Sequence, residues 1–136
     1  MQKLKKIDEQ TNVLNWFEIP VTDIDRAKKF YETILDIEMV KRADGKDEAV
    51  FFPFNPNVVQ AISGRVTGVL SKTVRNNPSN NGTVVYINAS PSIQTVLDKV
   101  EKAGGKVIAP KIQIPAGFIA IIIDSEGNKV GLHAEQ

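Results

Sequence analysis

The order of strand and helix patterns constrains the fold of this 136-residue chain more than any other feature. Apolar and polar residues alternate from 14 to 21, which predicts a half-buried strand. Asp23 is a suitable N-cap, and apolar residues spaced three and four apart then predict an amphipathic helix up to Leu35. Short apolar runs over 37–41, 50–54 and 58–63 predict three strands after this helix.

The second half of the chain predicts the same series. Residues 83–89 are strand-like, and Ser90 and Pro91 are expected as the N-cap and first residue of a helix that ends at Gly104 and Gly105. Three more strands are predicted over 106–109, 118–123 and 129–133. The breaker-rich stretch from Gly64 to Gly82 is expected to be a long loop between the halves.

Two βαβββ modules in tandem predict an α+β fold. We expect a curved eight-stranded mixed sheet, or half-barrel, with the helices outside and a concave face that can hold a ligand. Residues 1–12 are expected to form a flexible extension, and residues 13–136 a single domain. Within that domain, module one spans 13–64, a connecting loop spans 65–82, and module two spans 83–136.

Composition excludes several classes of partner. The 17 basic and 16 acidic residues give a net charge of +1, which offers no electrostatic reason to bind nucleic acid or an anionic membrane. No apolar run reaches the length of a membrane span. The absence of cysteine excludes disulfides and thiolate metal sites, and residues 1–12 lack the apolar stretch of a signal peptide. A cytoplasmic protein is therefore expected.

Several segments resemble the vicinal oxygen chelate superfamily, which includes glyoxalase I, bleomycin resistance proteins and extradiol dioxygenases. The resemblance extends from about Asn12 to Ala134 and includes both modules. It implies the glyoxalase-like fold, with a cup built within one chain or across a homodimer, and so it implies a homodimer here. The matching segments are residues 16–23, Arg26–Ala27, residues 30–32, 96–97, 103–107, 118–120 and 124–133.

The resemblance also locates the metal positions of the superfamily. Metal-dependent members place four His, Gln or Glu ligands on strand positions that face the cup, two from each module. None of the corresponding residues here is a competent ligand, so neither a metal nor another cofactor is expected. Gln60, beside the second position, is kept as a candidate ligand-binding residue. The four positions fall on Trp16, near Ala61, on Val84 or Thr83, and on Gly131.

Other polar residues are predicted on the same strand faces. Alternation places Glu18 on the face of Trp16, and His133 on the face of Gly131. A carboxylate and an imidazole in one cavity could exchange protons or hold a polar ligand. Glu18 could instead pair with Arg65, Lys129 or a backbone amide, and His133 could be structural. The predicted ligand-binding residues are Trp16, Tyr86, Asn88 and Gln60, and the predicted catalytic residues are Glu18 and His133.

Four functions fit these patterns. The first is a metal-independent module that binds a small organic molecule in the cup. The alternative is a divergent glyoxalase-type lyase or isomerase that uses Glu18 and His133 for proton transfer. A conventional metal-dependent lyase would require different ligand positions. An interaction role for the Asn-rich segment from Ser71 to Gly82 is the fourth.

Overall fold

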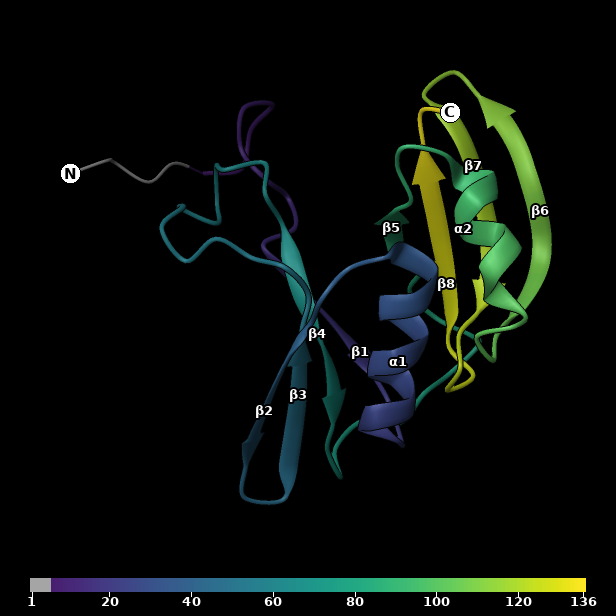
Figure 1. Ribbon diagram of the computed structural model, residues 1–136. Helices are drawn as coiled ribbons and strands as arrows, with labels where there is room; N and C mark the ends of the chain where they lie inside the picture. Colours follow the sequence, from purple (N-terminus) through teal and green to yellow (C-terminus); the bar gives the residue numbers. More distant parts are fainter. Residues whose placement is uncertain (1–5) are drawn as a thin grey trace.

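The computed structural model describes residues 6–136 and contains two βαβββ modules with identical strand order (Figure 1). The first module comprises β1 (Trp16–Pro20), α1 (Ile24–Leu35), β2 (Val40–Asp44), β3 (Asp47–Phe51) and β4 (Thr67–Lys72). The second comprises β5 (Tyr86–Asn88), α2 (Ile93–Val100), β6 (Lys106–Ile114), β7 (Gly117–Ile123) and β8 (Lys129–Ala134). The sheet orders are β1-β4-β3-β2 and β5-β8-β7-β6.

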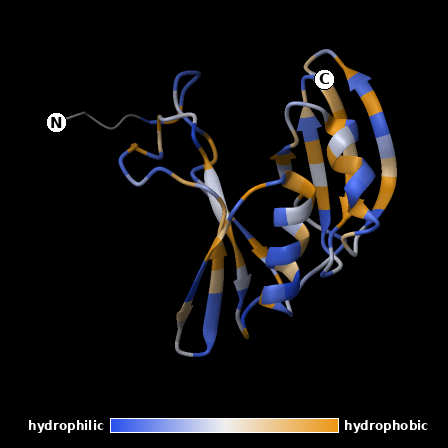
Figure 2. Cartoon of the chain, in the orientation of Figure 1, coloured by the Kyte–Doolittle hydropathy of each residue, from blue (hydrophilic) through white to orange (hydrophobic). Residues whose placement is uncertain are grey.

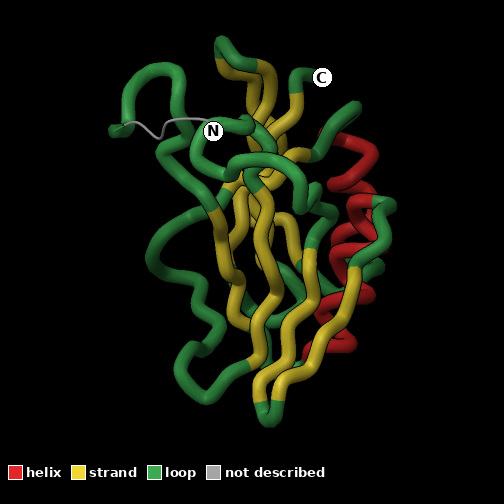
Figure 3. The backbone as a smooth tube through the Cα atoms, turned by 90° about the vertical axis from the view of Figure 1, so that its left-hand side faces the viewer, coloured by secondary structure: helices red, strands yellow, loops and turns green. Residues whose placement is uncertain are grey.

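These findings confirm the predicted α+β class and the repeated modules. The two four-stranded sheets do not join into one closed sheet within the described residues, and β1 and β5 are edge strands. Helices α1 and α2 contact each other, and both lie along one side of the molecule in Figure 3. Each sheet therefore has one face against the helices and one open face.

Helix α1 forms as its sequence predicts. The Asp23 side chain accepts a hydrogen bond from the Arg26 backbone N–H at 3.0 Å, which satisfies a donor at the start of the helix. The residues that it buries are spaced three and four apart: Ile24, Ala27, Phe30, Tyr31 and Ile34. The helix ends at Asp36, whose backbone is left-handed with φ 54°. The apolar side of α1 packs on β3 and β4.

The last strand of the first module corrects the sequence prediction. Residues 58–63, predicted as a strand, form turns, and β4 lies inside the segment 64–82 that was expected to be a loop. Gly68 was read there as a breaker. It instead lets β4 run close and parallel to β1, because a Cβ at this position would collide with the carbonyl oxygen and ring of Phe17.

Two other predicted boundaries shift. Strands β2 and β3 join through a two-residue hairpin at Gly45, with φ 62°, so both lie off their predicted ranges of 37–41 and 50–54. Ser92, and not Ser90, is the N-cap of α2. The reason is local: the Asn88 side chain accepts a hydrogen bond from the Ser90 N–H at 3.0 Å, so the chain turns before the helix begins.

A third boundary shift lengthens β6. This strand continues past its predicted end at Ala109 and includes Pro110, which an edge strand tolerates because its unpaired side needs no N–H. Figure 2 shows hydrophilic and hydrophobic residues interspersed along it. The predicted stop after α2 is confirmed, since Gly104 has φ 108° and the Gly105 N–H donates to the Val100 carbonyl at 2.9 Å.

The predicted N-terminal extension is described only in part. Residues 1–5 lie outside the described residues. Asn12 contacts the turns that precede β4, since its backbone N–H donates to the Ala61 carbonyl at 2.7 Å and its side chain donates to the Gln60 carbonyl. No helix among residues 6–136 is long and apolar enough to cross a membrane.

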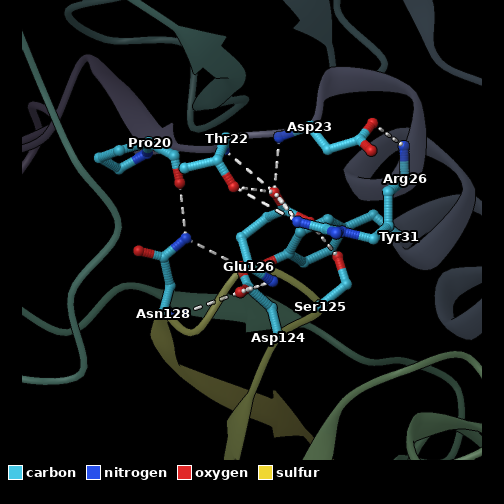
Figure 4. A network of polar contacts seen from close by, with 9 residues as sticks. All are labelled: Pro20, Thr22, Asp23, Arg26, Tyr31, Asp124, Ser125, Glu126 and Asn128. Carbon is cyan, nitrogen blue, oxygen red and sulfur yellow. Dashed lines mark hydrogen bonds and ion pairs between the residues drawn. The ribbon is translucent and has the colours of Figure 1, made fainter. Parts of the chain in front are cut away.

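The loop at 124–128 joins the second module to the first through hydrogen bonds (Figure 4). The Glu126 side chain, which is 0% exposed, accepts hydrogen bonds from the backbone N–H groups of Thr22 and Asp23 at 3.0 and 2.8 Å. It also forms an ion pair with Arg26 at 2.7 Å. Arg26 and the backbone N–H of Asp23 hold the pKa of Glu126 at about 2, and these contacts outweigh the opposing effect of burial.

Asp124 is the buried centre of the same loop. Its Oδ1 accepts the backbone N–H groups of Glu126 and Asn128 at 2.8 and 2.9 Å, and its Oδ2 accepts the Tyr31 hydroxyl at 2.6 Å. The Asn128 amide donates to the Pro20 carbonyl at 2.7 Å. Burial, followed by the nearby Asp124 charge, raises the pKa of Tyr31 well above its usual value, so Tyr31 remains a donor. We call the contacts of Asp124, Glu126 and Asn128 with residues 20–31 the intermodule clamp. The clamp fixes β1 relative to β8.

Candidate functional site

The open face of the first sheet carries two of the predicted site residues, Trp16 and Glu18. The strand register aligns Glu18, Val69 and Phe51 in one row across β1, β4 and β3. The Trp16 ring, 40% exposed, meets the Phe51 ring edge-on with centroids 6.0 Å apart. Together with Arg42 these residues line a hollow of about 340 Å³, which we call the trough.

Glu18 makes one polar contact in the trough. Its Oε1 accepts a hydrogen bond from the Asn76 amide at 3.4 Å. The ion pairs among the described side chains do not include one between Glu18 and either Arg65 or Lys129, the two partners considered from the sequence. The carboxylate is therefore available to a ligand.

A second hollow lies between the modules, beside the edge strands β1 and β5. This intermodule pocket has a volume of about 440 Å³, within the range of small-molecule sites. Two predicted site residues, Tyr86 and Asn88, line it from β5. Its remaining walls are mostly apolar: Phe17, Leu35, Ile37, Phe52, Pro53, Val66, Thr67, Ile87 and Ser90.

Few polar atoms are left to a ligand in this pocket. The Thr67 hydroxyl donates to the Pro53 carbonyl at 2.8 Å, and the Asn88 carbonyl oxygen accepts the Ser90 N–H. The Asn88 amide N–H₂ and the Tyr86 hydroxyl make no hydrogen bond within residues 6–136. The Ser90 hydroxyl, also in the lining, likewise makes no hydrogen bond within those residues. A pocket with mostly apolar side chains and three such groups can orient a small molecule that has polar atoms at one end.

The other two predicted residues line neither hollow. His133 Nε2 lies 2.8 Å from the Ala116 carbonyl, at the β6–β7 hairpin. Gln60 is half-buried in the turns before β4, where its side-chain Oε1 is buried without a hydrogen-bond partner. Glu18 and His133 lie in different sheets, and none of the cavities described for residues 6–136 has both in its lining. The structure does not bring this predicted catalytic pair together.

The residues at the superfamily's metal positions do not fit a metal. Ala61, near the second position, lies in a turn and has no metal-binding side chain, and the open-face residues of β4 are Thr67, Val69 and Ser71. At the fourth position, a Cβ on Gly131 would lie 2.5 Å from the Tyr86 ring, which occupies the space of a ligand side chain. Among residues 6–136, no group of three or more His, Asp or Glu residues could hold an ion.

Three lining residues of these hollows escaped the sequence analysis. Arg42 lies in β2 opposite Ala49, just beyond the end of the strand predicted over 37–41. Thr67 was placed in a loop, and Phe51 was treated as part of a run without a defined face. Alternation over 40–44 and 47–51 could have located Arg42 and Phe51, but only with the hairpin at Gly45 in place.

Comparisons with known proteins agree with this architecture. A family model described as the glyoxalase/bleomycin resistance protein/dioxygenase superfamily matches residues 13–132. No curated protein matches the chain. A glyoxalase/bleomycin resistance protein from Albidiferax ferrireducens has 19% identity and a TM-score of 0.65, over 89% of this chain and 97% of that one.

Two other solved structures share the fold. A glyoxalase I mutant from Zea mays has 21% identity and a TM-score of 0.64, over 88% of this chain and 46% of that one. The fosfomycin resistance protein FosX from Listeria monocytogenes has 12% identity and a TM-score of 0.61, over 92% and 91% of the two chains. The family match, the repeated modules and the shared fold place this chain in the glyoxalase/bleomycin resistance protein/dioxygenase superfamily.

Proposed function

We propose that the protein binds a small organic molecule in the intermodule pocket, without a resident metal ion. The observation that carries this proposal is the pocket of about 440 Å³ whose apolar walls come from both modules. The Tyr86 and Ser90 hydroxyls and the Asn88 amide are polar side-chain groups of its lining without a partner within the described chain. The ring of Tyr86 covers Gly131, so organic side chains occupy the place where a metal ligand would lie.

A pocket-filling variant tests this proposal. Val66 is a half-buried pocket wall, and Val66→Trp adds a ring to the space that a ligand would fill. Compounds that raise the melting temperature of chelator-treated wild type are expected to lose their effect in Val66→Trp. We expect Asn88→Asp to weaken their binding about tenfold, because it removes the amide donor and keeps the oxygen that accepts the Ser90 N–H.

Val59→Trp is the matched control, since Val59 is exposed in the turns outside the pocket. It is expected to bind the same compounds as wild type. Compounds that stabilise Val66→Trp as strongly as wild type would place binding elsewhere and contradict the proposal.

We also propose that the chain is a cytoplasmic homodimer. Its support is the exposed apolar surface on both open sheet faces, where Trp16, Tyr86 and Ile112 are 40, 50 and 58% exposed. Apolar residues that are exposed on the open faces of the sheets favour association with a second copy of the chain. Absence of cysteine fits a reducing compartment.

Sedimentation equilibrium is expected to give twice the chain mass of 15.0 kDa. Ile112→Glu places a charge on the open face of the second sheet and is expected to shift the protein toward monomer. Ile7→Glu, at an exposed residue before β1, is expected to leave the mass unchanged. A wild-type monomer at all concentrations would exclude the dimer.

A further inference from the structure

We infer that the trough on the first sheet is a separate binding site for a planar organic monocarboxylate that also carries a hydrogen-bond donor. The floor of the trough consists of small or short side chains, Ala49, Val69 and Ser71. A continuous floor of this kind on an open sheet leaves room for a flat molecule.

An aromatic wall bounds one end of the trough. Trp16 meets Phe51 edge-on at 6.0 Å, and Phe54 packs on Phe51 with centroids 5.7 Å apart. These contacts fix the orientation of Phe51 and leave the Trp16 indole 40% exposed. A planar ring can therefore stack or pack edge-on against this wall.

Arg42 supplies the positive charge. Its guanidinium carbon lies 5.4 Å from the centre of the Phe51 ring, which holds the group above the sheet. Arg42 makes no ion pair with an acidic side chain that the structure describes. A guanidinium held on an aromatic ring keeps its N–H groups for a carboxylate, which it can bind in bidentate geometry.

The negative charges of the trough restrict the ligand further. Asp47 pairs with Arg75 at 3.2 Å, so its charge is balanced within the rim. Glu48 also lines the trough, but it alternates with Asp47 along β3 and its charge acts on Lys41. Glu18 lies two strands from Phe51, roughly 10 Å across the sheet at the usual strand spacing. A ligand whose carboxylate binds Arg42 therefore has its far end near Glu18. The Glu18 carboxylate accepts a hydrogen bond from a donor at that end and repels a second carboxylate there.

Para-substituted benzoates test this arrangement. Calorimetric titration with 4-hydroxybenzoate is expected to show binding to wild type, and Arg42→Gln is expected to weaken it about tenfold or more. Lys41→Gln is the matched control, because it removes the same charge from the neighbouring residue. Lys41 lies on the helix side of β2 and pairs with Asp25 at 3.0 Å, so this variant is expected to bind like wild type.

Glu18 gives a second, independent readout. Terephthalate, which has a carboxylate at each end, is expected to bind wild type about tenfold more weakly than 4-hydroxybenzoate. Glu18→Gln is expected to remove most of that difference. Arg42 and Glu18 are both exposed, so neither change is expected to disturb folding.

Amide chemical-shift mapping separates this site from the intermodule pocket. Shifts caused by 4-hydroxybenzoate are expected at Arg42, Phe51 and Val69, and binding is expected to survive in Val66→Trp. Shifts centred on Tyr86 and Asn88 would overturn the inference that the trough is a binding site, and would leave the proposal of the intermodule pocket standing. Equal binding to Arg42→Gln and Lys41→Gln, or no binding of 4-hydroxybenzoate to wild type, would also overturn it.

Discussion

Asp124→Ala is expected to lower the free energy of unfolding by about 3 to 5 kcal/mol, because it removes a buried acceptor that serves several donors. Asp124 is 2% exposed and accepts the Tyr31 hydroxyl, two backbone N–H groups and the Asn128 amide. The substitution leaves these donors buried without a partner and frees the 124–128 loop that joins the modules.

Urea denaturation of wild type and variant measures this loss. Tyr31→Phe removes one donor and keeps the rest, so we expect an intermediate cost of about 1 to 2 kcal/mol. Asp25→Ala removes an exposed carboxylate that pairs with Lys41, and is expected to change the unfolding free energy by less than about 1 kcal/mol. A loss for Asp124→Ala no larger than that for Asp25→Ala would show that the clamp contributes little.

Glu126→Gln is expected to destabilise the protein near neutral pH and to have little effect in strong acid. The folded-state pKa of Glu126 is about 2, below the ordinary value of 4.5. A lowered folded-state pKa stabilises the protein above about pH 4.5, and this contribution disappears as the pH falls from 4.5 toward 2. The full shift corresponds to about 3 kcal/mol. Because its partner Arg26 is half exposed, solvent screening reduces our expectation to about 2 kcal/mol.

The difference between wild type and Glu126→Gln isolates this residue from the other carboxylates that titrate in acid. Unfolding free energies measured across the acid range are expected to converge as the pH approaches about 2. Glu101→Gln, at an exposed residue, is expected to follow wild type throughout. A difference that is constant with pH would show that the carboxylate charge has no part in the clamp.

The sequence predicted the helices and their ends well because the signals for them are local. The cap at Asp23, the spacing of apolar residues in α1 and the stop at Gly104 each depend on neighbouring residues. The resemblance segments also contain Asp23, Arg26 and Glu126. In the structure these three residues meet in the intermodule clamp.

The site was harder to predict because it depends on packing between distant segments. Alternation placed Trp16 with Glu18 on one face of β1, as the trough shows. It could not show that Trp16 and Tyr86 line different hollows, since that depends on how the modules are arranged. Reading Gly68 as a breaker hid β4, and with it the true partners of β1. Only the contact with Phe17 explains why glycine occurs within that strand.

The proposed chemistry follows from the same close packing. Gly131 has no side chain, and the Tyr86 ring fills the space above it. In the first sheet, the open-face residues of β4 are Thr67, Val69 and Ser71. These positions offer a metal ion few donor atoms. The intermodule pocket offers an organic molecule mostly apolar side chains with hydroxyl and amide groups among them.

The most direct test is a calorimetric titration of the strongest compound from the screen into chelator-treated protein, repeated with one equivalent of Ni²⁺ or Zn²⁺. We predict the same dissociation constant in all cases and no retention of either ion after dialysis. Binding that requires the added ion, with near-stoichiometric metal retained by the dialysed protein, would contradict a metal-independent pocket.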